Sequence, residues 1–272
     1  NPVLSQEEVR EMQRWIRVSL LLGLVCAAVC AVPLTAQEQD PLVSDRPDFT
    51  ESTGTIAPRH VQVEAGITWQ EVGKEDSLAV GEVLVRLGLG DNLEARLGVG
   101  SWSRIDTPVG RADGYDDPTL GIKVRLTDPQ EDRPPGLPAV ALLLGTTVPV
   151  GSGELTADEW QPEAKLALGW DLTDRLGLGV NLGYVWPDDG GERFHQLLAS
   201  VSAAITATDR LGFFLEAYGF SEETPDGGST RYADTGATFA LTDDLQLDAR
   251  IGFGLNDPSP ERYVGVGVAA RW

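Results

Sequence analysis

The sequence has no long hydrophobic run beyond residue 32. A membrane-spanning helix needs about 18 consecutive apolar residues, so this part of the chain can cross a membrane only with strands. Methionine is also scarce, with Met12 as the single example against 31 glycines. A chain that is poor in methionine, rich in glycine and punctuated by regular turns is typical of β structure rather than of helices.

Cysteine is almost absent. The two cysteines, Cys26 and Cys30, lie in an apolar stretch from 18 to 32 that follows a basic start and precedes small residues. These are the parts of a secretory signal peptide, which we predict over residues 1–36 with translation starting at Met12. A membrane anchor and a lipid on either cysteine are the competing interpretations, disfavoured because the stretch is short and valine precedes each cysteine. The exported chain would then have no thiol, which excludes disulfides and thiolate metal sites.

Basic residues are outnumbered by acidic ones, 21 to 42, for a formal net charge of −21. This excludes nucleic acid as a partner, because phosphate binding needs basic side chains. Much of the acidity falls in six connections that we predict to face outward, with 18 acidic and three basic residues. These connections are 70–78, 104–117, 150–160, 187–192, 221–229 and 256–261. We expect these connections to form a solvated acidic rim or to bind divalent cations diffusely next to lipopolysaccharide. A dedicated calcium site is not expected, because none of them has the spaced oxygen ligands of a calcium loop.

Recognisable catalytic motifs are missing too. There is no Walker loop, no dinucleotide fingerprint and no cluster of histidines and carboxylates with metal-ligand spacing. Of the two histidines, His60 and His195, the second lies near Ser221 in the predicted strand order. A turn centred on 208–209 places His195 opposite Glu222 instead, which disfavours a catalytic pair. We therefore predict a protein that is not an enzyme, with no catalytic residues, no metal and no cofactor.

Aspartate turns recur at a nearly constant spacing. They lie at Asp91, Asp128, Asp174, Asp209 and Asp243, separated by 37, 46, 35 and 34 residues. Each follows and precedes a run of alternating apolar and polar residues, which predicts β-hairpins. The runs give twelve strands, an even number, as in single-chain bacterial barrels. They span 60–69, 79–89, 93–103, 118–126, 139–149, 160–172, 175–186, 192–207, 210–220, 230–241, 244–255 and 262–272.

Alternation alone does not separate a membrane barrel from a soluble sandwich, because both have one apolar face. Three observations favour the barrel: aromatic residues gather at the predicted strand ends, the connections at one end are longer, and an exported chain ends on the aromatic Trp272. We predict an all-β, twelve-stranded antiparallel up-and-down transmembrane β-barrel over residues 60–272. Its expected location is the bacterial outer membrane, with the lipid bilayer, lipopolysaccharide and the outer-membrane assembly machinery as partners.

Charged residues on the polar strand faces must point into the lumen, because an arginine facing lipid costs about 2–4 kcal/mol at the midplane. The predicted lumen-lining residues are Glu82, Arg86, Glu94, Arg96, Lys123, Arg125, Lys165, Glu216, Tyr218, Asp248, Arg250, Tyr263 and Arg271. Two clusters are expected, Arg86 with Glu94 and Arg96, and Arg271 with Asp248 and Arg250. Such residues either fill a narrow barrel with salt bridges or form a charged path for solutes.

The segment 37–59 precedes the first predicted strand. Its charged residues Asp45, Arg46 and Asp48 suggest a small plug that enters the periplasmic mouth of the barrel and pairs with lumen charges. A disordered lead-in is the alternative.

The block Asp45-Arg-Pro-Asp-Phe-Thr-Glu51, with Pro58 and Val61-Gln-Val-Glu-Ala-Gly66 after it, resembles the MetA-pathway of phenol degradation family. The resemblance covers residues 44–272 and implies an outer-membrane barrel of transporter type, with no catalytic residues. We therefore expect a channel for passive diffusion of small, hydrophobic or aromatic solutes. A closed structural or adhesion barrel without transport is the alternative.

Overall fold

The computed structural model describes residues 42–127, 136–157, 159–225, 227–257 and 259–272. The predicted signal peptide, its start at Met12 and the Asp128 turn lie outside these residues. Within the described part, no helix has the length and hydropathy needed to cross a membrane.

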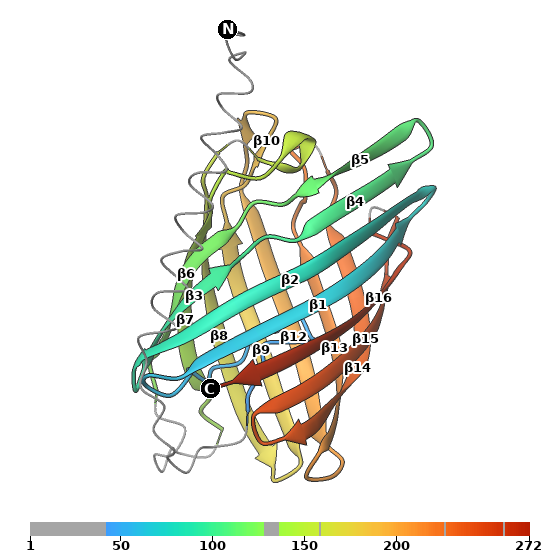
Figure 1. The fold of residues 1–272 in the computed structure, drawn as a ribbon. Coiled ribbons are helices and arrows are strands. Elements are labelled where there is room, and N and C mark those ends of the chain that lie inside the picture. Colours follow the sequence, from blue (N-terminus) through green and yellow to red (C-terminus); the bar gives the residue numbers. More distant parts are fainter. Residues whose placement is uncertain (1–41, 128–135, 158, 226, 258) are drawn as a thin grey trace, which may run out of the picture.

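Twelve strands form one closed antiparallel barrel, which confirms the predicted fold (Figure 1). Each strand pairs with its neighbours in chain order, and the barrel closes where β1 pairs with β16 from Gln62↔Arg271 to Glu71↔Arg262. The strands are β1 Val61–Val72, β2 Glu75–Gly90, β3 Leu93–Gly98, β6 Thr119–Arg125, β7 Ala139–Thr147, β8 Gln161–Thr173, β9 Leu176–Val185, β12 Gln196–Thr206, β13 Leu211–Phe220, β14 Thr230–Thr242, β15 Leu245–Gly254 and β16 Arg262–Arg271.

The polar face of the sheet points inward and the apolar face outward. Arg86, Glu94 and Lys123 have no exposed surface, whereas Leu215 is 62% and Val266 is 56% exposed. A soluble sandwich has the opposite arrangement, because its apolar faces form the core. The outside of this barrel therefore suits lipid, and the inside is a polar lumen.

The third predicted strand, 93–103, is wrong in its outer half. The chain breaks after β3 and continues as a hairpin of β4 Trp102–Thr107 and β5 Gly110–Tyr115, where we expected a loop over 104–117. The outer half of β2 pairs with β4 and its inner half with β3. Positive φ angles at Gly81, Glu82 and Gly100 mark the irregular stretch between the two pairings, a conformation that favours glycine.

Two other boundaries also differ from the prediction. The expected loop 70–78 is mostly strand, because β1 and β2 stay paired up to Val72↔Glu75 around Gly73. The eighth strand, predicted from 192, begins at Gln196 as β12, and the residues before it belong to a small hairpin of β10 Asp188–Asp189 and β11 Glu192–Arg193. A single 3-10 turn, η1 Gly153–Leu155, lies between β7 and β8. The strand ends in question lie beyond the lipid-facing band. Apolar and polar residues need not alternate there, so the sequence pattern does not mark where these strands end.

The two ends of the barrel differ. Tight turns join β2 to β3, β8 to β9 and β14 to β15 at one end, which we call the turn end (Figure 1). The opposite end, the loop end, holds the β4–β5 and β10–β11 hairpins and the connection from β7 to β8. In outer-membrane barrels the short turns are periplasmic and the longer loops extracellular.

Candidate functional site

Residues 42–60, which we call the inner segment, are bound inside the lumen by side chains of the wall. Glu216 on β13 accepts hydrogen bonds from the backbone N–H groups of Phe49 and Thr50, both at 2.7 Å. Glu94 on β3 accepts one from the N–H of Ile56 at 2.9 Å. An irregular backbone inside a barrel has no neighbouring strand, so wall carboxylates satisfy its donors.

Asp45 is the charged centre of this arrangement. Its carboxylate lies 2.7 Å from Arg96, 2.9 Å from Lys123 and 3.3 Å from Arg86. The Asp45 and Lys123 side chains are almost completely buried. Removing one partner of such a cluster leaves uncompensated buried charge, so Asp45 fixes the inner segment to β2, β3 and β6.

Arg46 extends the ion pairs of the inner segment further along β2 and to β15. Its guanidinium lies 2.8 Å from Glu82 on β2 and 3.3 Å from Asp248 on β15. On the way it passes Gly66 and Gly267, where an added Cβ would meet the guanidinium within 2.5 Å. Any larger side chain at either glycine would displace Arg46, so these two glycines are required by close approach.

Aromatic rings join the inner segment to β13 and β14. Phe49 stacks on Tyr218 with ring centroids 4.5 Å apart, and Tyr218 stacks on Tyr232 at 4.6 Å. The Tyr218 hydroxyl donates to the Tyr263 hydroxyl at 3.0 Å, and Tyr263 donates to Asp234 at 2.8 Å. Tyr218, which we predicted to line the lumen, therefore packs against the inner segment, and Tyr263, also predicted there, binds Tyr218 from the wall.

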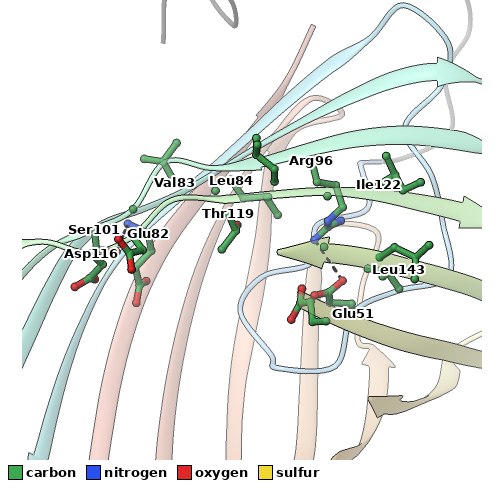
Figure 2. Close-up of a pocket in the computed structure, with 18 residues that line it drawn as sticks. Glu51, Glu82, Val83, Leu84, Arg96, Ser101, Asp116, Thr119, Ile122 and Leu143 are labelled. Carbon is green, nitrogen blue, oxygen red and sulfur yellow. Dashed lines mark hydrogen bonds and ion pairs between the residues drawn. The ribbon is translucent and has the colours of Figure 1, made fainter. Parts of the chain in front are cut away.

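Beside the inner segment, the described part of the lumen contains at least two cavities. The larger, about 1130 Å³, opens at the turn end between the inner segment and a wall that includes Gly177 and Gly179 of β9 and Gly212 of β13. The smaller, about 360 Å³, lies under β2, β3, β6 and β7 toward the loop end (Figure 2). Leu84 and Leu143 give it apolar walls, and its outer border includes Asp116. Burial raises the pKa of Asp116, against a hydrogen bond from Ser103 that lowers it.

Most predicted lumen residues contact the inner segment or one of these cavities, but one predicted cluster does not form. Asp248 pairs with Arg46, and Arg250 donates to the carbonyl oxygen of Pro47 at 2.9 Å. Arg271 instead pairs with Asp244 in the last turn. The expected contact of Arg271 with Asp248 and Arg250 is wrong because the register places Arg271 at the turn end. Arg125 lies at the same end and donates to Asn92.

Two residues of the site were not among the predicted ones, Glu51 and Asn181. The Glu51 carboxylate pairs with Lys165 at 2.9 Å. Asn181 on β9 accepts from the N–H of Glu51 and donates to its carbonyl oxygen. The sequence held one indication of this role. Asn181 is the one polar side chain among glycines on the inward face of its strand, and an amide can both donate and accept hydrogen bonds.

The two histidines lie at different ends of the barrel: His60 borders the larger cavity at the turn end, and His195 precedes β12 at the loop end. His195 bonds the Tyr184 hydroxyl and lies 6.0 Å from the Trp186 ring, while the Ser221 hydroxyl accepts from the N–H of Leu197. The predicted register between β12 and β13 was wrong by one residue. Leu198 pairs with Phe220, so His195 is not level with Glu222 as predicted. In the described part of the chain, no three His, Cys, Asp or Glu side chains gather as a metal site.

The family model described as Putative MetA-pathway of phenol degradation matches residues 44–272. The chain belongs to this family. The match begins within the inner segment, so the segment and the barrel are parts of one family unit.

Solved outer-membrane proteins share the fold, among them the following two. An outer membrane channel from Pseudomonas putida F1 is 13% identical, with a TM-score of 0.64 over 86% of this chain and 100% of that chain. The KdgM porin is 9% identical, with a TM-score of 0.50 over 77% and 98%. No curated protein matches the sequence. A closed barrel with an apolar outside is the form that β proteins take in the outer membrane, and this chain is an outer-membrane barrel.

Proposed function

We propose that this protein is a channel through which small, hydrophobic or aromatic solutes diffuse passively across the bacterial outer membrane. The observation that carries the proposal is the pair of cavities, one toward each end of the lumen, with the inner segment between them. Family membership and the fold of the Pseudomonas putida channel support it. The lining mixes charged side chains with Leu84, Leu143 and Phe214, which suits solutes with both apolar and polar groups.

We further propose that the inner segment is a plug, as its residues Asp45, Arg46 and Asp48 suggested. Asp45 and Arg46 pair with wall charges, and Asp48 borders the larger cavity. The predicted division of the chain into a plug segment, 37–59, and a barrel, 60–272, holds if the inner segment acts as a plug.

A closed structural barrel is the second candidate. The complete burial of Arg86 and Lys123 favours it, because their cationic groups and the carboxylate of Asp45 are packed together inside the lumen. Liposome swelling separates the two functions. A channel gives rates that depend on the solute, with small neutral aromatic compounds entering faster than large sugars, whereas a closed barrel gives none. Equal swelling with and without the protein would overturn the channel.

We assign no catalytic role. The contacts of His195 with Tyr184 and of Ser221 with a backbone N–H support this, because a Ser–His pair needs the two side chains within hydrogen-bond reach. Hydrolysis of an ester that is lost in the His195→Ala variant would contradict it. Contact with lipopolysaccharide and recognition of the barrel by the assembly machinery stay predictions.

A further inference from the structure

Glu51 is the only residue, in the described part of the chain, that lines both cavities. It belongs to the inner segment, and its carboxylate forms an ion pair with Arg96 at the border of the smaller cavity (Figure 2). The partition between the two spaces is therefore thinnest at this side chain.

The Glu51 carboxylate connects two distant strands of the wall. One oxygen lies 2.9 Å from Lys165 on β8 and the other lies 3.3 Å from Arg96 on β3. Its backbone is fixed separately, because Asn181 on β9 accepts from its N–H at 2.8 Å and donates to its carbonyl oxygen at 3.0 Å. The side chain can thus move while the backbone of the segment stays bound.

The ion pairs of Glu51 are weaker than those of Asp45. The Glu51 side chain is 19% exposed and has two cationic partners, whereas Asp45 is 4% exposed and has three. Partly solvated ion pairs cost less to separate than fully buried ones. A side chain that moves should be one whose contacts are easily broken. Glu51 is therefore suited to act as a gate, and Asp45 is suited to anchor the inner segment.

We propose that the Glu51 side chain is the gate between the two cavities, closed while it bridges Arg96 and Lys165. Swinging or shortening this side chain joins the cavities into one path. The proposal rests on the proposed channel function and adds the residue that controls it.

Single-channel conductance in planar bilayers tests the gate. Glu51→Ala is expected to raise conductance severalfold, and Glu51→Gln, which keeps the size but loses the charge, is expected to give a smaller rise. Glu163→Ala is the matched control, because Glu163 lines the smaller cavity alone. Equal conductance of the Glu51→Ala and Glu163→Ala variants would overturn the gate.

Cysteine accessibility is a second test of the gate. If Glu51 only stabilised the structure, replacing it would not change which cysteines a reagent can reach. In a background with Cys26 and Cys30 replaced by serine, Thr119→Cys reports on the smaller cavity and Thr238→Cys on the larger one. With Glu51 present, a charged thiol reagent should modify Thr119→Cys only from the loop end and Thr238→Cys only from the turn end. In the Glu51→Ala background each cysteine should become reactive from both ends.

The two proposals fail in different ways. Solute-dependent swelling without the gained access would overturn the gate and leave the channel. Gained access without any solute-dependent swelling would overturn the channel and leave a gate in a closed barrel. A Glu51→Ala protein that does not refold would be replaced in the access experiment by Glu51→Gln, for which the same gain is expected to a smaller extent.

Discussion

The two sides of the lumen are built on different principles. The side formed by β2, β3, β6 and β8 projects long charged residues, namely Arg86, Glu94, Arg96, Lys123 and Lys165. The side formed by β9, β12, β13 and β14 projects small residues over much of its inner half, namely Gly177, Gly179, Ser202, Ala204 and Gly212. We call them the charged wall and the small-residue wall.

This difference explains where the lumen is full and where it is open. The charged wall fills its space with guanidinium and ammonium groups and holds the inner segment through ion pairs. The small-residue wall leaves the larger cavity, and it holds the segment through hydrogen bonds to Asn181 and Glu216. One wall therefore supplies anchorage and the other supplies room.

We expect the largest effect from removing the inner segment, which both walls bind. Deleting residues 40–56 takes away most of the inner segment and should raise single-channel conductance more than any point substitution, because the two cavities then merge. Planar-bilayer recording of the refolded variant measures this. Unchanged conductance would show that the segment is no plug.

Asp45→Asn breaks the charged wall alone. The substitution leaves Arg86, Arg96 and Lys123 without their shared counter-charge and should lower the free energy of unfolding by about 3 kcal/mol. Urea unfolding in lipid vesicles measures the change. Asp209→Asn, in an exposed turn, is the control and should leave stability nearly unchanged. If both variants unfold alike, the Asp45 cluster contributes nothing.

Gly177→Val fills the small-residue wall alone. An added Cβ at Gly177 would meet its nearest atoms at 3.8 Å and 3.9 Å, so the side chain fits and projects into the larger cavity. We expect a moderate fall in conductance with the fold intact. Leu182→Val on the outward face of the same strand should not change conductance. A fall in both variants would point to a general defect.

Tyr218→Phe is expected to have the smallest effect. It removes the hydroxyl that donates to Tyr263 and keeps the ring that stacks on Phe49. The loss should be about 1 kcal/mol of unfolding free energy with conductance unchanged. A larger loss would mean that the hydrogen bond, rather than the stacking, holds the inner segment on this side.

Strand number was predictable because a barrel strand is a local pattern. Apolar and polar residues alternate between turns such as those at Asp174 and Asp243, and each pattern lies within one strand. The β4–β5 hairpin was not predictable, because beyond the lipid-facing band neither face has to be apolar. The pairing of Arg271 failed for another reason: alternation does not fix the register between β15 and β16, which pairs Asp248 with Gly267 and Arg250 with Gly265.

The sequence by itself determined the β class, the twelve strands and the inward direction of the charged side chains, since alternation and lipid leave one arrangement. The tertiary structure decided which charges meet. Asp45 and Glu51 are close in sequence, yet one is buried among three cations and the other borders two cavities. That difference arises because the inner segment meets strands from around the whole barrel, and only closure brings those strands to a common lumen.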